Sequence, residues 1–337
     1  MKTIFVIDDS DVNLITAKRA LEGKYNVRTM PSAVKMLSII EKIRPDLILL
    51  DIEMPEMDGF AAITKLKENK NTADIPVIFL TAYETDEIEA LGLEHGAIDF
   101  IKKPFSAPVL LNRIKHHLDI EELLQKRTQR LQHLTDSILE VFADMVESRD
   151  RVTGGHIDRT SKYMEILVSE MLKVGVYEQE IKSWDLKTIV SSARLHDVGK
   201  IAISDLILNK PGKLTEKEYE QVKKHVEEGE RIIEKMIDKT GEETVLFHAK
   251  RFAGYHHEKW DGTGYPRGLA GKEIPLEGRI VAIVDVYDAL VSDRPYRKAL
   301  SREEAESIIW KEKGKHFDPA IVNVFAGITD QFAHVYM

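Results

Sequence analysis

The stretch DLILLDIEMP, residues 46–55, decides how the first part of the chain folds. It is a short apolar run that ends in Asp51, and similar runs recur with amphipathic helical patterns between them. The runs are Thr3–Ile7, Val27–Met30, Asp46–Leu50, Val77–Leu80 and Phe100–Ile101; the helical patterns are Asn13–Leu21, Ala33–Ile43, Phe60–Lys67 and Glu87–His95. Strands that alternate with helices predict βαβ units and a parallel sheet covered on both faces.

Polar side chains follow four of these runs. Asp8 and Asp9 follow the first, Asp51 the third, Thr81 the fourth and Lys103 the fifth. A single acid at a strand end means little, but the carboxyl ends of parallel strands share one edge, where ligands bind. Three clustered carboxylates suit Mg²⁺, which neutralises the acids so that one of them can attack a phosphoryl group. The lysine could then pair with the resulting phosphate.

These positions resemble the receiver domain of bacterial two-component response regulators, over about residues 1–120. The resemblance implies a flavodoxin-like α/β fold, Asp51 as the phosphoacceptor and a histidine kinase as the phosphoryl donor. It also implies that Asp9, Asp51 and the backbone carbonyl of Glu53 hold Mg²⁺, while Asp8 acts through water. The positions that respond to phosphorylation are matched by Thr81 and Phe100, beside Lys103.

A long stretch without glycine or proline follows, from about residue 109 to residue 151. Leu124, Leu131, Ile138 and Met145 recur every seven residues, which favours a left-handed coiled coil and hence a homodimer. The alternative is one amphipathic helix that packs on its own domain. We expect a receiver domain at 1–120, a helical linker at 121–150 and a second domain at 151–337.

The second domain is predicted to be helical. Its amphipathic stretches are Arg159–Val174, Glu178–His196, Glu216–Met236 and Arg279–Leu290. A polar loop, Glu258–Pro275, is rich in glycine and proline, and loops of that length inside a compact domain are usually functional or mobile.

Several of the 12 histidines lie in motif-like settings in this domain. The residues are His156, the pair His196-Asp197, His225, the pair His256-His257, and Asp285. Imidazole with carboxylate suits iron, manganese or zinc. Neighbouring residues on a helix point about 100° apart, so His196 and Asp197 do not address one metal from the same direction. A carboxylate that bridges two metals resolves this, and a two-metal centre activates water for phosphoryl displacement.

The same segments resemble the HD-GYP domain, from about residue 145 to residue 330. The matching phrases are GH at 155–156, HDVGK at 196–200, HHE at 256–258, DGTGYP at 261–266, DVYDAL at 285–290, RPYR at 294–297 and FDP at 317–319. The resemblance implies an all-α metal-dependent phosphohydrolase. It further implies that the substrate is cyclic di-GMP, which is opened to linear pGpG, with hydrolysis onward to GMP left open.

By this resemblance the metal ligands fall into two sets. His156, His196, Asp197 and Asp285 would serve one metal, and Asp197 would bridge to a second. The second metal would also be held by His225, His256 and His257. Phosphate contacts would come from Lys200, Arg294 and Arg297, with Lys200 and Asp197 in the catalytic role. Members that hold a third metal carry a glutamate where Val152 stands, so we predict two metals, iron or manganese.

Composition narrows the remaining choices. With no cysteine, any metal has nitrogen and oxygen ligands. The N-terminal apolar run is too short for a signal peptide and no run is long enough to span a membrane, so we expect a cytoplasmic protein. A net charge of −9 makes DNA a poor partner but leaves room for a local phosphate pocket.

Other functions stay open from the sequence. Another cyclic dinucleotide or phosphoester could be the substrate. The second domain could instead be a non-catalytic interaction module; the Gly-Tyr-Pro loop is expected to contact partners, including cyclase domains. The presence of every expected ligand argues against a purely non-catalytic role.

Overall fold

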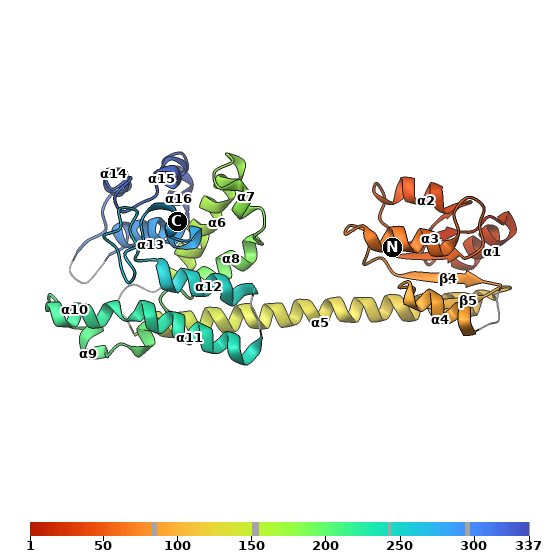
Figure 1. The fold of residues 1–337 in the computed structure, drawn as a ribbon, viewed down its shortest axis with the longest axis horizontal. Helices are drawn as coiled ribbons and strands as arrows, with labels where there is room; N and C mark the ends of the chain where they lie inside the picture. The colour runs from red at the N-terminus through yellow and green to blue at the C-terminus, as the bar shows by residue number, and fades with distance from the viewer. Residues whose placement is uncertain (83–85, 150–154, 242–243, 294–296, 337) are drawn as a thin grey trace. The chain divides into compact units, whose positions relative to one another are not determined.

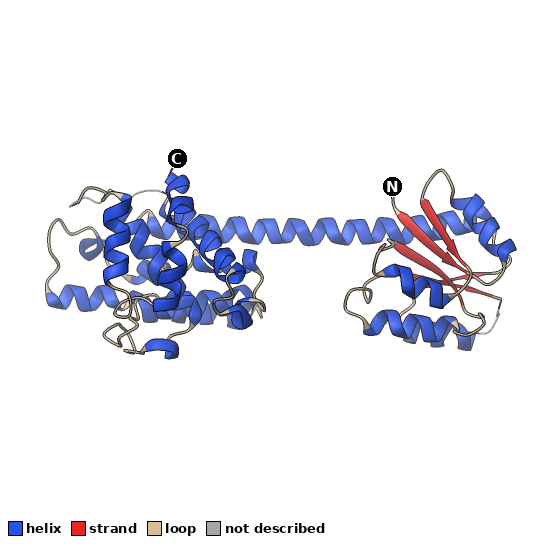
Figure 2. Ribbon diagram, turned by 90° about the horizontal axis from the view of Figure 1, so that it is seen from above, coloured by secondary structure: helices blue, strands red, loops and turns tan. Residues whose placement is uncertain are grey.

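The computed structural model describes residues 1–82, 86–149, 155–241, 244–293 and 297–336. The chain divides into two compact units, Met1–Arg130 and Leu131–Met337. Their helices and strands are labelled in Figure 1. Each unit is built in a different way, the first around a sheet and the second from helices alone (Figure 2).

The first unit contains a five-stranded parallel sheet in the order β2-β1-β3-β4-β5. The strands are β1 Thr3–Ile7, β2 Asn26–Met30, β3 Leu47–Asp51, β4 Val77–Thr81 and β5 Asp99–Lys102. This confirms the predicted α/β fold. The register pairs Asp51 with Leu80 and Thr81 with Lys102, so the carboxyl ends of β3, β4 and β5 lie side by side.

Helices cover both faces of this sheet. They are α1 Asp11–Leu21, α2 Ala33–Ile40, α3 Gly59–Glu68, α4 Asp86–Glu94 and the first turns of α5 Ala107–Glu147. Successive residues of a strand point to opposite faces. Phe5 and Ile48 therefore pack with α2 and α3, whereas Ile4 and Leu49 pack with α1 and α5. Such burial on both faces explains the nearly continuous apolar runs in the sequence.

Helix α5 is 41 residues long and begins two residues before the predicted start. Its outer stripe is more than half exposed: Leu124 55 %, Leu131 64 %, Ile138 58 % and Met145 64 %. A different side of the helix, with Leu139, Ala143 and Val146, is buried in a core of the second unit. The last turns of the helix thus pack in the second unit, while the seven-residue stripe stays exposed.

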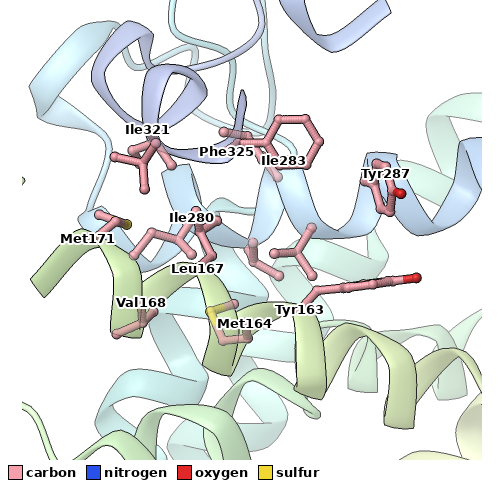
Figure 3. Packing of buried hydrophobic residues seen from close by; sticks show 14 of the residues in the cluster. Tyr163, Met164, Leu167, Val168, Met171, Ile280, Ile283, Tyr287, Ile321 and Phe325 are labelled. Carbon is pink, nitrogen blue, oxygen red and sulfur yellow. The ribbon is translucent and has the colours of Figure 1, made fainter. Parts of the chain in front are cut away.

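The second unit is all-helical, which confirms the second part of the predicted fold class. Its elements are α6 His156–Lys173, α7 Glu178–Ile181, α8 Leu186–Ala193, η1 Val198–Ala202, α9 Asp205–Leu208, α10 Glu216–Lys223, α11 His225–Thr240, α12 Thr244–Tyr255, η2 Gly271–Glu273, α13 Leu276–Val291, α14 Arg302–Lys311, α15 Pro319–Ala326, α16 Thr329–Ala333 and η3 His334–Tyr336. Figure 3 shows Leu167 of α6, Ile280 of α13 and Phe325 of α15 in one core.

Two predicted helices are each divided in the structure. The stretch predicted as Glu178–His196 forms α7 and α8, because Asp185 starts a new helix by accepting a hydrogen bond from the Thr188 backbone N–H. The stretch predicted as Glu216–Met236 forms α10 and α11, with His225 as the first residue of α11. The sequence analysis also gave no helix for α12, α14, α15 or α16.

Candidate active site

Three carboxylates meet at the carboxyl edge of the receiver-like sheet. Oxygens of Asp8, Asp9 and Asp51 lie within 4.8 Å of one another, with Asp8 and Asp51 buried and Asp9 exposed. Lys103 Nζ lies 2.7 Å from Asp8 Oδ2 and 2.7 Å from Asp51 Oδ1. The structure therefore brings together the acids and the lysine that the sequence placed after separate strands.

The charge balance at this edge differs between its members. Burial raises the pKa of Asp51, and the hydrogen bond from Lys103 offsets only part of that shift. Burial lowers the pKa of Lys103, but its bonds to Asp51 and Asp8 outweigh burial and leave it raised. Lys103 is thus a cation held in place between two acids.

The remaining predicted receiver residues lie around the same edge. Thr81 is buried at the end of β4, and the Phe100 ring packs against Phe79 at a centroid distance of 5.6 Å. Glu53 is exposed and lines a surface groove with Asp9. The arrangement is compatible with the predicted roles of these residues, which stay predictions.

The second unit contains two groups of residues able to hold metal ions. Each group offers ligand atoms within 4.8 Å of one another. One consists of His225, His256 and His257, and the other of His156, His196 and Asp285. They come from α6, α11 and α13 and from the turns after α8 and α12, segments that are far apart in the sequence.

The carboxylate of Asp197 lies between these groups. Its Oδ1 is 3.4 Å from His225 Nε2 and 3.6 Å from His256 Nε2. Its Oδ2 is 3.5 Å from His196 Nε2 and 2.7 Å from Lys200 Nζ. Asp197 follows α8 rather than lying in a helix, so the chain bends between His196 and Asp197. Each of the two Asp197 oxygens thus faces a different group of histidines.

The hydrogen bonds of the histidines orient them for metal binding. The Nδ1 atom of His196 lies 2.9 Å from the Ala193 carbonyl, and that of His225 lies 2.7 Å from the Val222 carbonyl. Likewise, His256 Nδ1 lies 3.0 Å from the Ala253 carbonyl. A carbonyl accepts only, so each Nδ1 carries the proton and each Nε2 keeps its lone pair, as in metal-ligating histidines.

Two features of these Nε2 atoms indicate whether metal ions fit this centre. The lone-pair nitrogens of His225 and His256 face each other at 3.1 Å. The Nε2 atom of His196 is buried and has no hydrogen-bond partner among the described residues. Facing or unpartnered acceptors are costly when buried, and a shared cation would satisfy them. The ligand set therefore fits divalent transition-metal ions, which prefer imidazole with carboxylate.

The electrostatics of the centre favour the same chemistry. Burial lowers the pKa of His225 to about 4 and holds the pKa of His257 well below its usual range, so both rings are neutral near pH 7. Burial alone would raise the pKa of Asp197, but Lys200 and the neighbouring histidines hold it well below its ordinary value. Neutral imidazoles and an ionised carboxylate are the forms that bind metals.

A cavity of about 150 Å³ opens onto this centre. Its lining includes His156, Asp197, Lys200, His257 and Asp285. The cavity is smaller than the roughly 300–1,000 Å³ of pockets that enclose drug-sized ligands. It therefore has room for a phosphate group and water, with the rest of a larger ligand outside.

Of the two predicted arginines, Arg297 lies within the described residues and stands apart from this cavity. Arg297 donates hydrogen bonds to the backbone carbonyls of Ala289 and Leu290 and is not among the described residues that line the cavity. Arg294 lies outside the described residues, as does Val152. Lys200 is accordingly the predicted phosphate contact that the structure places at the centre.

The structure also reveals residues that the sequence analysis did not assign. The Asp288 carboxylate lies 2.7 Å from His156 Nδ1 and accepts two hydrogen bonds from Arg159, so it fixes the orientation of that histidine. Its signal was present, because Asp288 follows Asp285 by three residues and shares its helix face. Glu147, at the end of α5, lines the cavity as well.

The Gly-Tyr-Pro loop is in contact with the metal-binding histidines. The Tyr265 ring stacks on His257 at a centroid distance of 4.7 Å, and its backbone N–H donates to the His257 carbonyl. The buried Glu258 carboxylate accepts hydrogen bonds from the backbone of Arg267 and Leu269. The loop is thus anchored to the centre, and partner contact remains a prediction for its outer side.

Comparisons with known proteins agree with both units. A family model described as a response regulator receiver domain matches residues 4–115, and one described as an HD domain matches residues 120–321. A "Probable cyclic di-GMP phosphodiesterase" of Vibrio cholerae is 39 % identical over 96 % of this chain and 77 % of the relative. The "Cyclic di-GMP phosphodiesterase response regulator RpfG" of Xanthomonas campestris is 37 % identical over 95 % of this chain and 86 % of the relative.

A third relative matches a smaller part of the chain. The "3'3'-cGAMP-specific phosphodiesterase 2" of Vibrio cholerae is 39 % identical over 60 % of this chain and 36 % of the relative. Within the described residues, no helix is long and apolar enough to cross a membrane. The chain belongs to the family of response regulators in which a receiver domain precedes an HD domain of the metal-dependent phosphodiesterase type.

Proposed function

We propose that this chain is a cyclic di-GMP phosphodiesterase whose activity is controlled by phosphorylation of Asp51. The observation that supports it most is the Asp197 carboxylate between two sets of ligands, with Lys200 at the mouth of the same centre. Two relatives that match 95–96 % of this chain are named for this substrate. The product would be linear pGpG, and hydrolysis onward to GMP is left to measurement.

The residues of the centre divide the chemical work. Two metal ions, when bound, would lower the pKa of a water molecule and neutralise the charge that develops on the phosphate. His156, His196 and Asp285 would hold one ion, His225, His256 and His257 the other, and Asp197 would bridge them. Lys200 would orient a phosphate oxygen. Arg297 would have to leave the carbonyls of α13 to contribute, and the role of Arg294 stays a prediction.

Control would begin at the receiver edge. Asp9, Asp51 and the Glu53 carbonyl would hold Mg²⁺, with Asp8 acting through water, and a histidine kinase would supply the phosphoryl group. Lys103 would then bind the phosphorylated Asp51, and Thr81 and Phe100 would respond. Helix α5 starts in the first unit and ends in the second, so it would carry the response.

Assembly and location follow from weaker signals. The exposed stripe of α5 would pair with a second copy as a coiled coil, in line with its seven-residue repeat. We place the domains at 1–120 and 151–337, joined by the linker at 121–150, in a cytoplasmic protein. The Gly-Tyr-Pro loop would be the contact for a cyclase, and DNA is not expected as a partner.

A second candidate substrate is 3',3'-cGAMP. A relative that matches 60 % of this chain is named for that dinucleotide, and the cavity would bind the phosphate rather than the base. A purely non-catalytic role is disfavoured because every predicted metal ligand is brought to one centre.

The test is hydrolysis by protein loaded anaerobically with iron or manganese. Cyclic di-GMP and 3',3'-cGAMP are incubated separately, and products are separated by chromatography, with Asp197→Ala beside the wild type. We expect pGpG from wild type alone and two transition-metal ions per chain. Hydrolysis of 3',3'-cGAMP alone would change the substrate. No turnover with occupied metal sites, before and after phosphorylation, would overturn the proposal, and three ions would contradict the predicted metal count.

A further inference from the structure

The residue that follows the last turns of α5 makes an unusual set of contacts. The Arg149 guanidinium donates hydrogen bonds to the backbone carbonyls of Ile201 and Ile203, at 2.6 and 3.0 Å, and approaches that of Lys200 at 3.4 Å. It also pairs with the Asp205 carboxylate at 2.8 Å. One side chain thus contacts four residues of the segment from 200 to 205, three through their backbone carbonyls and Asp205 through its carboxylate.

This segment carries the chemistry of the proposed centre. Asp197 is the residue before η1, and the Lys200 backbone N–H donates to the Asp197 carbonyl at 2.9 Å. The Lys200 ammonium, in turn, lies 2.7 Å from Asp197 Oδ2. Any displacement of η1 therefore moves both the bridging carboxylate and the lysine.

Close packing fixes η1 at a second point. A Cβ atom on Gly199 would lie 1.8 Å from the His225 carbonyl oxygen, so η1 rests directly on the start of α11. Gly199 permits this approach because it has no side chain. The segment thus contacts the His225 backbone through Gly199 and the Arg149 guanidinium through its carbonyls.

Backbone contacts anchor the arginine itself. The Asn209 side-chain amide donates to the Arg149 carbonyl at 2.8 Å. Arg149 lies two residues beyond α5, whose preceding turn contributes Ala143, Val146 and Glu147 to the cavity. The planar guanidinium suits this role because it presents several donors in a rigid fork.

We propose that Arg149 is a positioning residue that holds the 200–205 segment, and through it Asp197 and Lys200, in the geometry of the metal centre. The inference rests on the proposed function of Asp197 and Lys200. It gives the end of α5 a specific mechanical role: a shift of α5 changes the grip of Arg149 and thereby the position of the bridging carboxylate. Arg149 is required even though it contacts neither metal nor substrate.

The test compares three substitutions in the full-length chain. Arg149→Ala removes the grip, and Arg149→Lys keeps the charge but loses the fork. Lys187→Ala is the matched control, because Lys187 lies on α8 and pairs with Asp136 of α5 at 2.9 Å. Mn²⁺ affinity by equilibrium dialysis, kcat and KM on cyclic di-GMP, and the melting temperature are measured for each.

Supporting partners of metal ligands typically contribute about 10- to 100-fold to metal affinity or activity. We expect Arg149→Ala to lose that much Mn²⁺ affinity and kcat, Arg149→Lys to recover only part, and Lys187→Ala to remain within about twofold of wild type. Guanidinium ion at low millimolar concentration should partly restore Arg149→Ala, which a merely structural defect would not allow.

The result that overturns the proposal is Mn²⁺ affinity and kcat for Arg149→Ala equal to those of Lys187→Ala. Equal loss in all three variants, or a loss that follows the melting temperature without rescue, also overturns it. If the wild type itself hydrolyses no cyclic dinucleotide, the proposed function fails, but Mn²⁺ affinity still decides whether Arg149 positions the centre.

Discussion

At the receiver edge Lys103 Nζ lies 2.7 Å from Asp51, and in the second unit Lys200 Nζ lies 2.7 Å from Asp197. Around these similar pairs the ligands differ. The receiver edge offers only carboxylates, one of them exposed, whereas the second centre offers buried imidazoles with a carboxylate between them. Oxygen ligands suit Mg²⁺, which keeps several waters, and imidazoles suit transition metals.

The different surroundings of Asp51 and Asp197 indicate different roles for the two carboxylates. Burial raises the pKa of Asp51. Its carboxyl group lies close to Lys103 at the carboxyl edge of the sheet. Asp197 is held strongly ionised by Lys200 and the histidines around it. The first arrangement fits a carboxylate that reacts with a phosphoryl group, and the second fits a carboxylate that remains a ligand.

The largest expected effect comes from removing that ligand. Asp197→Ala should leave both metal sites without their shared carboxylate and cost several kcal/mol of transition-state stabilisation, which is about 1,000-fold or more in kcat. Metal content should fall as well, by elemental analysis. Asp238→Ala, an exposed acid on α11, is the control. Comparable turnover in the two variants would show that Asp197 does not bridge a catalytic centre.

A smaller effect separates the two lysines. Lys200→Ala removes a charged contact to phosphate, and such hydrogen bonds contribute about 1.5–3 kcal/mol, or about 10- to 100-fold in kcat/KM. Metal content should be unchanged, unlike in Asp197→Ala. Lys103→Ala should leave basal hydrolysis intact and impair only the response to phosphorylation. Full activity for Lys200→Ala would remove Lys200 from the phosphate site.

Much of this comparison was accessible from sequence. Short apolar runs that alternate with amphipathic helical patterns predicted the parallel sheet, and its common edge then predicted the convergence of Asp8, Asp51 and Lys103, as observed. In the second unit, the different directions of His196 and Asp197 on a helix predicted a carboxylate between two metal sites, and the Asp197 oxygens lie near histidines of both groups. Both predictions used local chemistry together with a simple rule of arrangement.

Other features depend on contacts between distant segments, which a sequence does not display. Arg149 reads as one more polar residue at the end of a helix, yet it grips carbonyls more than fifty residues away. The break before α8 depends on a local cap at Asp185 that competes with continued helical periodicity. Tyr265 was assigned to a loop for partner contact, and its stacking on His257 was not predicted.

The proposed phosphorylation site, Asp51, can be tested against a second aspartate beside the same strand. Asp51 ends β3, whereas Asp46 precedes its other end and pairs with Lys2 at 2.8 Å. A small-molecule phosphoryl donor should phosphorylate wild type and Asp46→Asn, detected by intact-protein mass, but not Asp51→Asn. Coupling energies of about 1–3 kcal/mol correspond to roughly 5- to 150-fold changes, so hydrolysis should change at least fivefold on phosphorylation. An unchanged rate in phosphorylated wild type would argue against control by Asp51.

The smallest effect on turnover is expected on the outer stripe of α5, where the change is in assembly. Leu131→Asp places a charge on a residue of the stripe that is exposed in the single chain and would be buried in the dimer. Loss of a buried leucine in each of two copies costs about 1.5–3 kcal/mol per side chain. The dimer dissociation constant should therefore rise about 100-fold or more. Gln129→Asp, about 200° away around the helix, adds the same charge off the seam. Sedimentation should show a monomer for Leu131→Asp and a dimer for Gln129→Asp. A wild-type chain that is monomeric at high concentration would leave the stripe without the partner that its repeat predicts.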